Sequence, residues 1–244
     1  MADAGERPLI LTIFGGEPNG PLNRFAREMH DVWGFGPTDA ISRRREEETC
    51  AASALGVESI WLDLPDAIYR GDRYLNDEHL FGAIHPEEAR LYRDIRAAIF
   101  EMLNARGIDA STFYCPIGIG NHVDHQHVLA SARSLTYRGY AVIAWEDFPY
   151  AGDPDVEVES VAMRRSSGAP DLRRLTDEQL HRKIDAIACY ASQHDVIFRH
   201  QGDAALATRT YAERIGDGVP AERFWPLGCI ASSPVESAGN ETSN

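Results

Sequence analysis

The sequence is short of basic residues, and above all of lysine. Its 244 residues include 24 Lys and Arg against 38 Asp and Glu, a net charge of −14, and Lys183 is the only lysine. Nucleic-acid binding depends on basic patches that neutralise phosphates and release counterions. The charge balance therefore argues against a nucleic-acid partner and favours a small neutral or cationic substrate.

Paired cysteines and long apolar runs are also lacking. Cys50, Cys115, Cys189 and Cys229 lie far apart and form no CxxC pair, so the sequence indicates neither a cysteine-rich zinc site nor a disulfide framework. No apolar run approaches the roughly 20 residues that span a bilayer, and the start, MADAGERP, lacks a signal-peptide pattern. We expect no membrane span and a reducing, cytoplasmic location.

What the sequence does contain is an alternation of strand and helix patterns. Short apolar runs predict adjacent parallel strands at 8–16, 57–63, 111–118 and 140–147, and helical patterns follow at 40–56, from Pro86, after His122 and from Thr176. Strands separated by helices predict a Rossmann-like α/β fold, with a mostly parallel sheet covered by helices on both faces. We assign residues 1–230 to one such domain and 231–244 to a disordered polar tail.

One motif stands out, GIGNHVDHQHV at 118–128, which follows a predicted buried strand. Ligands of open α/β sheets bind beyond the carboxyl ends of the strands, so the motif has the right position for a functional site. His122 and His125 are neighbours on one face of the expected helix, and Asp124 could orient an imidazole by accepting its N–H. The alternative is a capped helix start whose histidines are exposed and without function.

Five stretches together resemble the PIG-L/LmbE-like family of zinc-dependent N-deacetylases: RRREEETCAASALGV, LDLPDAIYR, GIGNHVDHQHV, WEDFPYA and KIDAIACYASQ. The resemblance implies hydrolysis of an N-acetyl group, commonly on a glucosamine-type sugar, so the expected partner is an N-acetylglucosamine-type acetylated amine. It also implies a zinc ion that lowers the pKa of a bound water toward about 7. The glycine-containing stretches GGEPNG and GIGNHVDH lack the GxGxxG spacing of a dinucleotide site, which disfavours a nucleotide-binding protein.

The resemblance also implies roles for single residues. His125 matches a zinc ligand, His122 the histidine that stabilises the oxyanion, and Asp124 its orienting partner. Residues expected to contact substrate are Arg44 or Arg45 in the RRREEE run, and more weakly Asp66, Arg70, Glu146 and Asp147 in loops. For the arginines the alternative is a solvated helix face with ion pairs, and for the loop residues it is ordinary polarity and capping.

The chain departs from the family in one respect. It has no segment of the His-Pro-x-Asp-Asp type, which supplies two zinc ligands and the general base in that family. We expect either that an N-terminal strand and helix, with these ligands, lie upstream of Met1, or that a catalytically silent homologue acts as a small-molecule binding or scaffold protein. A makeshift site from His122, His125, His127 and Glu17 is disfavoured because these helix positions do not converge. Whether the chain forms a homo-oligomer is left open.

Overall fold

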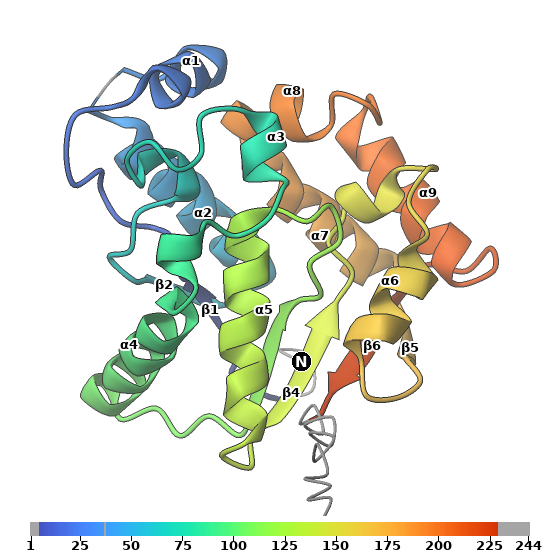
Figure 1. The fold of residues 1–244 in the computed structure, drawn as a ribbon. Helices are drawn as coiled ribbons and strands as arrows, with labels where there is room; N and C mark the ends of the chain where they lie inside the picture. The colour runs from blue at the N-terminus through green and yellow to red at the C-terminus, as the bar shows by residue number, and fades with distance from the viewer. Residues whose placement is uncertain (1–4, 37, 229–244) are drawn as a thin grey trace, which may run out of the picture.

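The computed structural model describes residues 5–36 and 38–228, so the expected tail at 231–244 lies outside the described residues (Figure 1). The strands are β1 Leu9–Thr12, β2 Glu58–Trp61, β3 Thr112–Pro116, β4 Ala141–Trp145, β5 Asp171–Arg174 and β6 Ala221–Leu227. The helices are α1 Arg24–Trp33, α2 Ala40–Leu55, α3 Asp77–Leu80, α4 Leu91–Arg106, α5 Val123–Thr136, α6 Val158–Arg165, α7 Asp177–Ala188, α8 His194–Ile197 and α9 Ala204–Ile215, with short 3₁₀ turns η2 Ala67–Tyr69, η3 Pro86–Glu88, η4 Tyr150–Gly152 and η5 Ala191–Gln193.

The strands form a mixed α/β arrangement, which confirms the fold class. β1 pairs with β2 and β3 with β4, both in parallel, as expected. The four strands do not form one continuous run, however, because the β1–β2 pair is a separate sheet. β6 pairs antiparallel with both β4 and β5, so the second sheet, β3-β4-β6-β5, is mixed and not mostly parallel. Strand β6 was not predicted from its sequence, AERFWPL, because a proline within a short polar and aromatic run argues against a strand.

Helices cover both faces of the strands, also as expected. In Figure 1, α4 and α5 lie in front of the strands, and α2 and α7 lie behind them. The predicted stripe of α5 packs into the main core through Leu129, Ala132 and Leu135. Ile95 and Ile99 of α4 pack with Ile13 and Leu62 beside the first parallel pair. The expected capping box of α7 is formed by the residues Thr176 and Gln179.

One expectation about the cysteines is wrong. Cys50 on α2 and Cys189 at the end of α7 form a disulfide, with their Cα atoms 5.8 Å apart. The two residues are separated by 139 positions, but α2 and α7 pack against each other and bring them together. Sequence spacing alone carries no information about such a tertiary pairing. Cys115 is a free, buried thiol.

No helix in the described part of the chain is long and apolar enough to cross a membrane. The feature that matters for function is the edge at which β3 and β4 end. Both strands point toward the upper part of the view in Figure 1, and α5 begins there. The motif at 118–128 therefore lies at the carboxyl edge of a parallel pair, as predicted.

Candidate functional site

The turn between β3 and α5 needs residues that adopt positive φ angles. Gly118, Gly120 and Asn121 have φ values of 86°, 83° and 62°. A Cβ atom on Gly120 would lie 2.7 Å from Cγ of Tyr150, so only glycine fits there. The Asn121 amide donates to the carbonyl oxygens of Phe81 and Gly82, at 3.1 and 2.8 Å. These contacts fix the point from which α5 starts.

His122 is the N-cap residue of α5, and its Nδ1 accepts the backbone N–H of Asp124 at 3.1 Å. Because Nδ1 is the acceptor, Nε2 carries the proton in the neutral ring. Burial lowers the pKa of His122 below its usual value, and the nearby His125 adds to this, although the charges of Asp124 and Asp66 oppose it. His122 can therefore donate a hydrogen bond from Nε2 in its neutral form, without carrying a positive charge.

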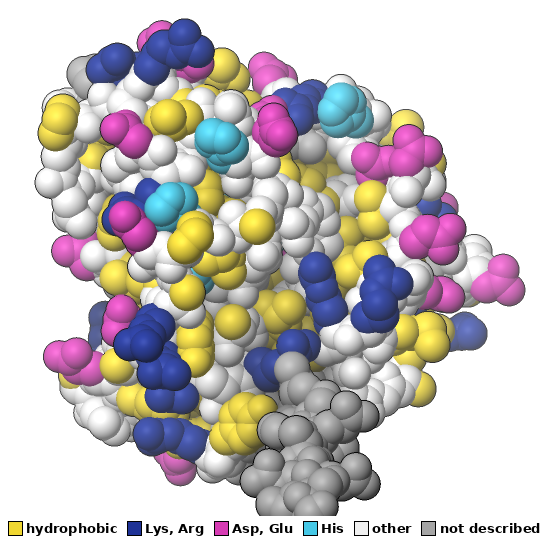
Figure 2. Space-filling view, in the orientation of Figure 1, with side chains coloured by type: hydrophobic (Ala, Val, Ile, Leu, Met, Phe, Trp, Pro, Cys, Tyr) yellow, Lys and Arg dark blue, Asp and Glu magenta, His cyan; other side chains and the backbone are white. Residues whose placement is uncertain are grey.

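His125 lies one helical turn further on, and the centroids of the two imidazole rings are 5.4 Å apart. Its Nδ1 is 2.6 Å from Oδ1 of Asp147, which follows β4. The aromatic ring of Tyr150 contacts His125 edge to face, with centroids 5.9 Å apart, and Phe81 does the same for His122 at 5.3 Å. Burial raises the pKa of Tyr150 to about 12, so its hydroxyl stays protonated. The two histidines thus share one position with aromatic walls. On the face drawn in Figure 2, acidic, basic and hydrophobic side chains are interspersed.

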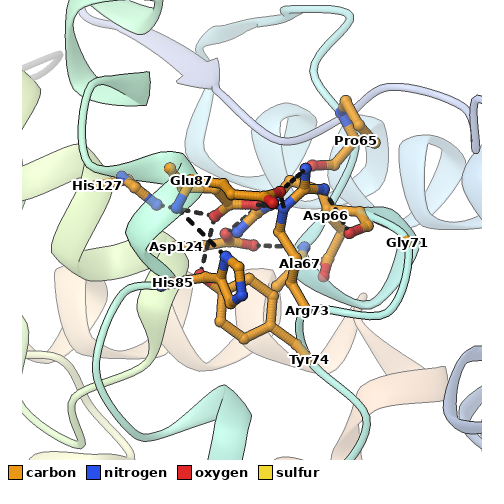
Figure 3. Close-up of polar contacts among 12 residues, drawn as sticks. Pro65, Asp66, Ala67, Gly71, Arg73, Tyr74, His85, Glu87, Asp124 and His127 are labelled. Carbon is orange, nitrogen blue, oxygen red and sulfur yellow. Dashed lines mark hydrogen bonds and ion pairs between the residues drawn. The ribbon is translucent and has the colours of Figure 1, made fainter.

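Asp124 does not hold an imidazole, contrary to expectation. Its carboxylate accepts the N–H of Ala67 at 3.1 Å and pairs with Arg70 at 2.7 Å. Figure 3 shows Asp124 pointing from α5 into the loop that contains Pro65, Ala67 and Gly71. Arg70, expected at the rim of the site, is itself buried. The pair therefore anchors the start of α5 to this loop.

The same network reaches deeper through Glu88. Arg70 donates to Glu88 at 2.9 Å, the Tyr74 hydroxyl donates at 2.9 Å, and the His127 Nε2 lies 3.2 Å from the carboxylate. His127 is buried and its Nε2 faces Glu88, and among the described residues it forms no metal-binding group with His122 and His125. The sequence did not predict Glu88 as part of the site, because the helix dipole already accounts for a glutamate in a first helical turn.

Arg44 and Asp66 meet as an ion pair, with a distance of 3.1 Å. Burial would lower the pKa of Arg44, but the charge and hydrogen bond of Asp66, together with the nearby Tyr69 and Asp124, raise that pKa above its usual value. Burial would likewise raise the pKa of Asp66, but Arg44 and His122 lower it. Arg45 instead donates to the carbonyl oxygen of Gly15 at 3.0 Å. Arg44 thus binds the loop beside His122, and Arg45 binds the segment that follows β1.

Glu146 is directed away from this group. Its carboxylate accepts the Tyr211 hydroxyl at 2.5 Å and the Trp225 indole N–H at 3.0 Å, and it pairs with Arg223 at 2.7 Å. These partners belong to α9 and β6. The structure brings Asp147 to His125, and it places the adjacent Glu146 in the packing between β4, β6 and α9.

A cavity of about 340 Å³ adjoins the site. Arg44 is part of its wall, and so are Phe148 and Pro149, which directly follow Asp147. Most of the remaining wall is apolar and comes from β2, α2, α7 and α8 and from residues that closely follow β1, α7 and α8: Phe14, Ile41, Trp61, Ile187, Tyr190, Ile197 and Phe198. This wall gives room for an apolar or uncharged part of a ligand beside Arg44.

The described residues fit one metal ligand but not a full zinc site. Hydrolytic zinc sites use about three protein ligands and keep one position open. Among residues 5–36 and 38–228, no group of three or more His, Cys, Asp or Glu side chains is arranged to hold a metal ion. His125 is suited to be one ligand, since its Nδ1 is occupied by Asp147 and its Nε2 is not.

No family model matches the chain. It is 25% identical to the 2'-N-acetylparomamine deacetylase of Niallia circulans over 62% of its own length and 59% of the relative's length. It is 31% identical to the 2'-N-acetylparomamine deacetylase of Streptomyces fradiae over 63% of its length and 54% of that protein's. The match thus spans little more than half of the length of these curated relatives.

Solved structures of deacetylases share the fold almost throughout. The crystal structure of the A40926 pseudoaglycone deacetylase Dbv21 is 28% identical, with a TM-score of 0.73 over 95% of this chain and 89% of that one. The zinc-inhibited form of teicoplanin deacetylase Orf2 is 24% identical, with a TM-score of 0.78 over 95% and 91%, and shows the likeness of fold alone. The homologues of this chain are therefore deacetylases, and it has their mixed α/β fold.

Proposed function

We propose that this chain carries part of the active site of an N-deacetylase, a hydrolase that removes an acetyl group from an N-acetylated amino sugar. The observation that supports this most is the placement of His122 and His125 at the carboxyl edge of a parallel pair, with His125 held by a buried carboxylate. The relatives named for 2'-N-acetylparomamine, an acetylated amine, support the substrate class.

Each residue of the site has a task in this proposal. His122 donates from Nε2 to the carbonyl oxygen of the acetamide, where negative charge develops during attack on the carbonyl carbon. His125 presents its free Nε2 beside it as one metal ligand. Arg44, held by Asp66, lines the cavity and contacts the sugar portion. Asp124 and Arg70 fix the helix from which both histidines project.

The proposed reaction includes a zinc ion. A solved protein of the same fold, teicoplanin deacetylase Orf2, has a zinc-inhibited form, which supports a role for a metal ion. One histidine does not hold a hydrolytic zinc ion, so the proposal places the other ligands and the general base outside the described residues. That they precede Met1 stays a prediction, as does a cytoplasmic location. The Cys50–Cys189 disulfide argues for an oxidising compartment instead.

The test compares two proteins for zinc content and for acetate release from N-acetylglucosamine-type substrates. The 244-residue chain is expected to bind zinc weakly and to release no acetate. A protein that begins upstream of Met1 is expected to carry a His-Pro-x-Asp-Asp type segment, to bind about one zinc per chain, and to lose it on His125→Asn. Full activity of the 244-residue chain would show that the argument about missing ligands is wrong.

The second candidate is a catalytically silent protein that binds a small molecule in the same place. The lack of a three-ligand group in the described residues favours it. An in-frame stop codon directly upstream of Met1, together with ligand binding that is indifferent to zinc, would make this reading the better one.

A further inference from the structure

The carboxylate of Asp147 is held on three sides by contacts that leave it little freedom. Its Oδ2 accepts the backbone N–H groups of Gly118 and Ile119 at 2.8 and 2.9 Å, and its Oδ1 lies 2.6 Å from Nδ1 of His125. The Asp147 side chain is 0% exposed, whereas that of His125 is 34% exposed. A buried, fixed group thus holds one end of an imidazole whose other end reaches the site.

This contact decides which nitrogen of His125 carries the proton. An ionised carboxylate only accepts hydrogen bonds, and so the hydrogen between the two atoms belongs to Nδ1 of His125. In the neutral ring Nε2 is then left with its lone pair free. The opposite holds for His122, whose Nδ1 accepts a backbone N–H and whose Nε2 therefore carries the proton.

We propose that Asp147 is the positioning residue of His125: it fixes the Nδ1–H tautomer and the ring orientation, so that an electron pair on Nε2 faces the site beside the N–H donor of His122. The two histidines of one helical turn are thereby given opposite properties, an acceptor and a donor, by two different partners. This replaces the substrate-contact role expected for Asp147. It rests on the proposed function for what His125 binds, but the tautomer itself is independent of that function.

The tautomer is measured by long-range ¹H–¹⁵N NMR of the histidine rings in the metal-free 244-residue chain at about pH 8, with His125→Asn used to identify the His125 signals. Wild type is expected to show the Nδ1–H form at His125. Asp147→Asn is expected to switch it to the Nε2–H form, because the amide oxygen keeps the N–H groups of Gly118 and Ile119 and the amide NH₂ turns a donor toward Nδ1.

Glu146→Gln is the matched control, since Glu146 also follows β4, is also buried and is bound instead by Tyr211, Trp225 and Arg223. It should leave the His125 signals unchanged. An Nε2–H form in wild type overturns the proposal even if Asp147→Asn does not fold, and so does a control that shifts His125 as much as Asp147→Asn. A correct tautomer in wild type and a switch in Asp147→Asn support it. If His125→Asn then alters neither zinc binding nor acetate release in an active, upstream-extended protein, the proposed function fails while the role of Asp147 stands.

Discussion

Arg70 Nη1 lies 2.7 Å from Oδ1 of Asp124, and both side chains are buried. The same guanidinium donates to Glu88, so a single cation pairs with two buried carboxylates from different segments. Burial alone would lower the pKa of Arg70, but the charges of Asp124 and Glu88 outweigh it and raise that pKa. The loop at 65–74 and the start of α5 are therefore joined by charge, and each depends on the other.

Removing this cation should be costly. Arg70→Met is expected to lower the free energy of unfolding by about 3–5 kcal/mol, because it leaves Asp124 buried without a counter-charge and leaves Glu88 with the more distant Arg73, 3.7 Å away. Arg106→Met is the control, since Arg106 pairs with Glu58 at the surface, and it should cost about 0–1 kcal/mol. Urea denaturation measures both. Equal costs for the two variants would show that Arg70 does not hold the loop.

The acid stability of the protein should depend on Glu88. Burial would raise the pKa of Glu88, but the hydrogen bond with His127 and the charge of Arg70 lower it from 4.5 to about 2. A carboxyl whose pKa is lowered on folding stabilises the protein above its unfolded pKa, and this stability is lost as the pH falls. The free energy of unfolding should thus drop by up to about 3 kcal/mol between about pH 4.5 and pH 2 through this group.

The comparison that isolates the effect is Glu88→Gln against Glu87→Gln, each followed by denaturation at several pH values. Glu87 pairs with Arg73 at the surface, so Glu87→Gln should leave unchanged the slope of the free energy of unfolding against pH below about pH 4.5. The slope should be clearly smaller in Glu88→Gln than in wild type. A slope that stays the same in Glu88→Gln would place the acid-sensitive group elsewhere.

The sequence predicts the frame of the site but not the partners within it. Apolar runs and glycine turns are local signals, and they place β1 to β4 and the start of α5 correctly. Asp124 is two positions from His122 and was expected to orient it, yet the carboxylate that holds an imidazole is Asp147, 22 positions from His125. Such partners depend on how neighbouring strands end in space, which no local pattern records. The Cys50–Cys189 pairing and strand β6 were missed for the same reason.

His122 should contribute less to folding than the apolar face of its helix. His122→Ala removes one N-cap hydrogen bond and should cost about 0.5–2 kcal/mol. Leu129→Ala leaves a cavity in the main core and should cost about 2–5 kcal/mol. Both are measured by thermal and urea unfolding. If the histidine variant proves the less stable of the two, His122 is a structural residue, and the proposed role as a donor to the substrate loses its main support.

The disulfide should make stability depend on reducing agent. Cys50 and Cys189 close a loop over a separation of 139 residues, so the bond restricts the unfolded chain strongly and should add about 2–5 kcal/mol to the free energy of unfolding. Adding dithiothreitol is therefore expected to lower the unfolding midpoint of the wild-type chain. The double variant Cys50→Ala/Cys189→Ala is the control: it should unfold near the midpoint of the reduced wild type and should not respond to reductant, because the remaining described cysteine, Cys115, is a free thiol. A wild-type midpoint that ignores dithiothreitol, with two free thiols titrated at these positions, would contradict the prediction and leave the packing of α2 against α7 to hold the two helices together.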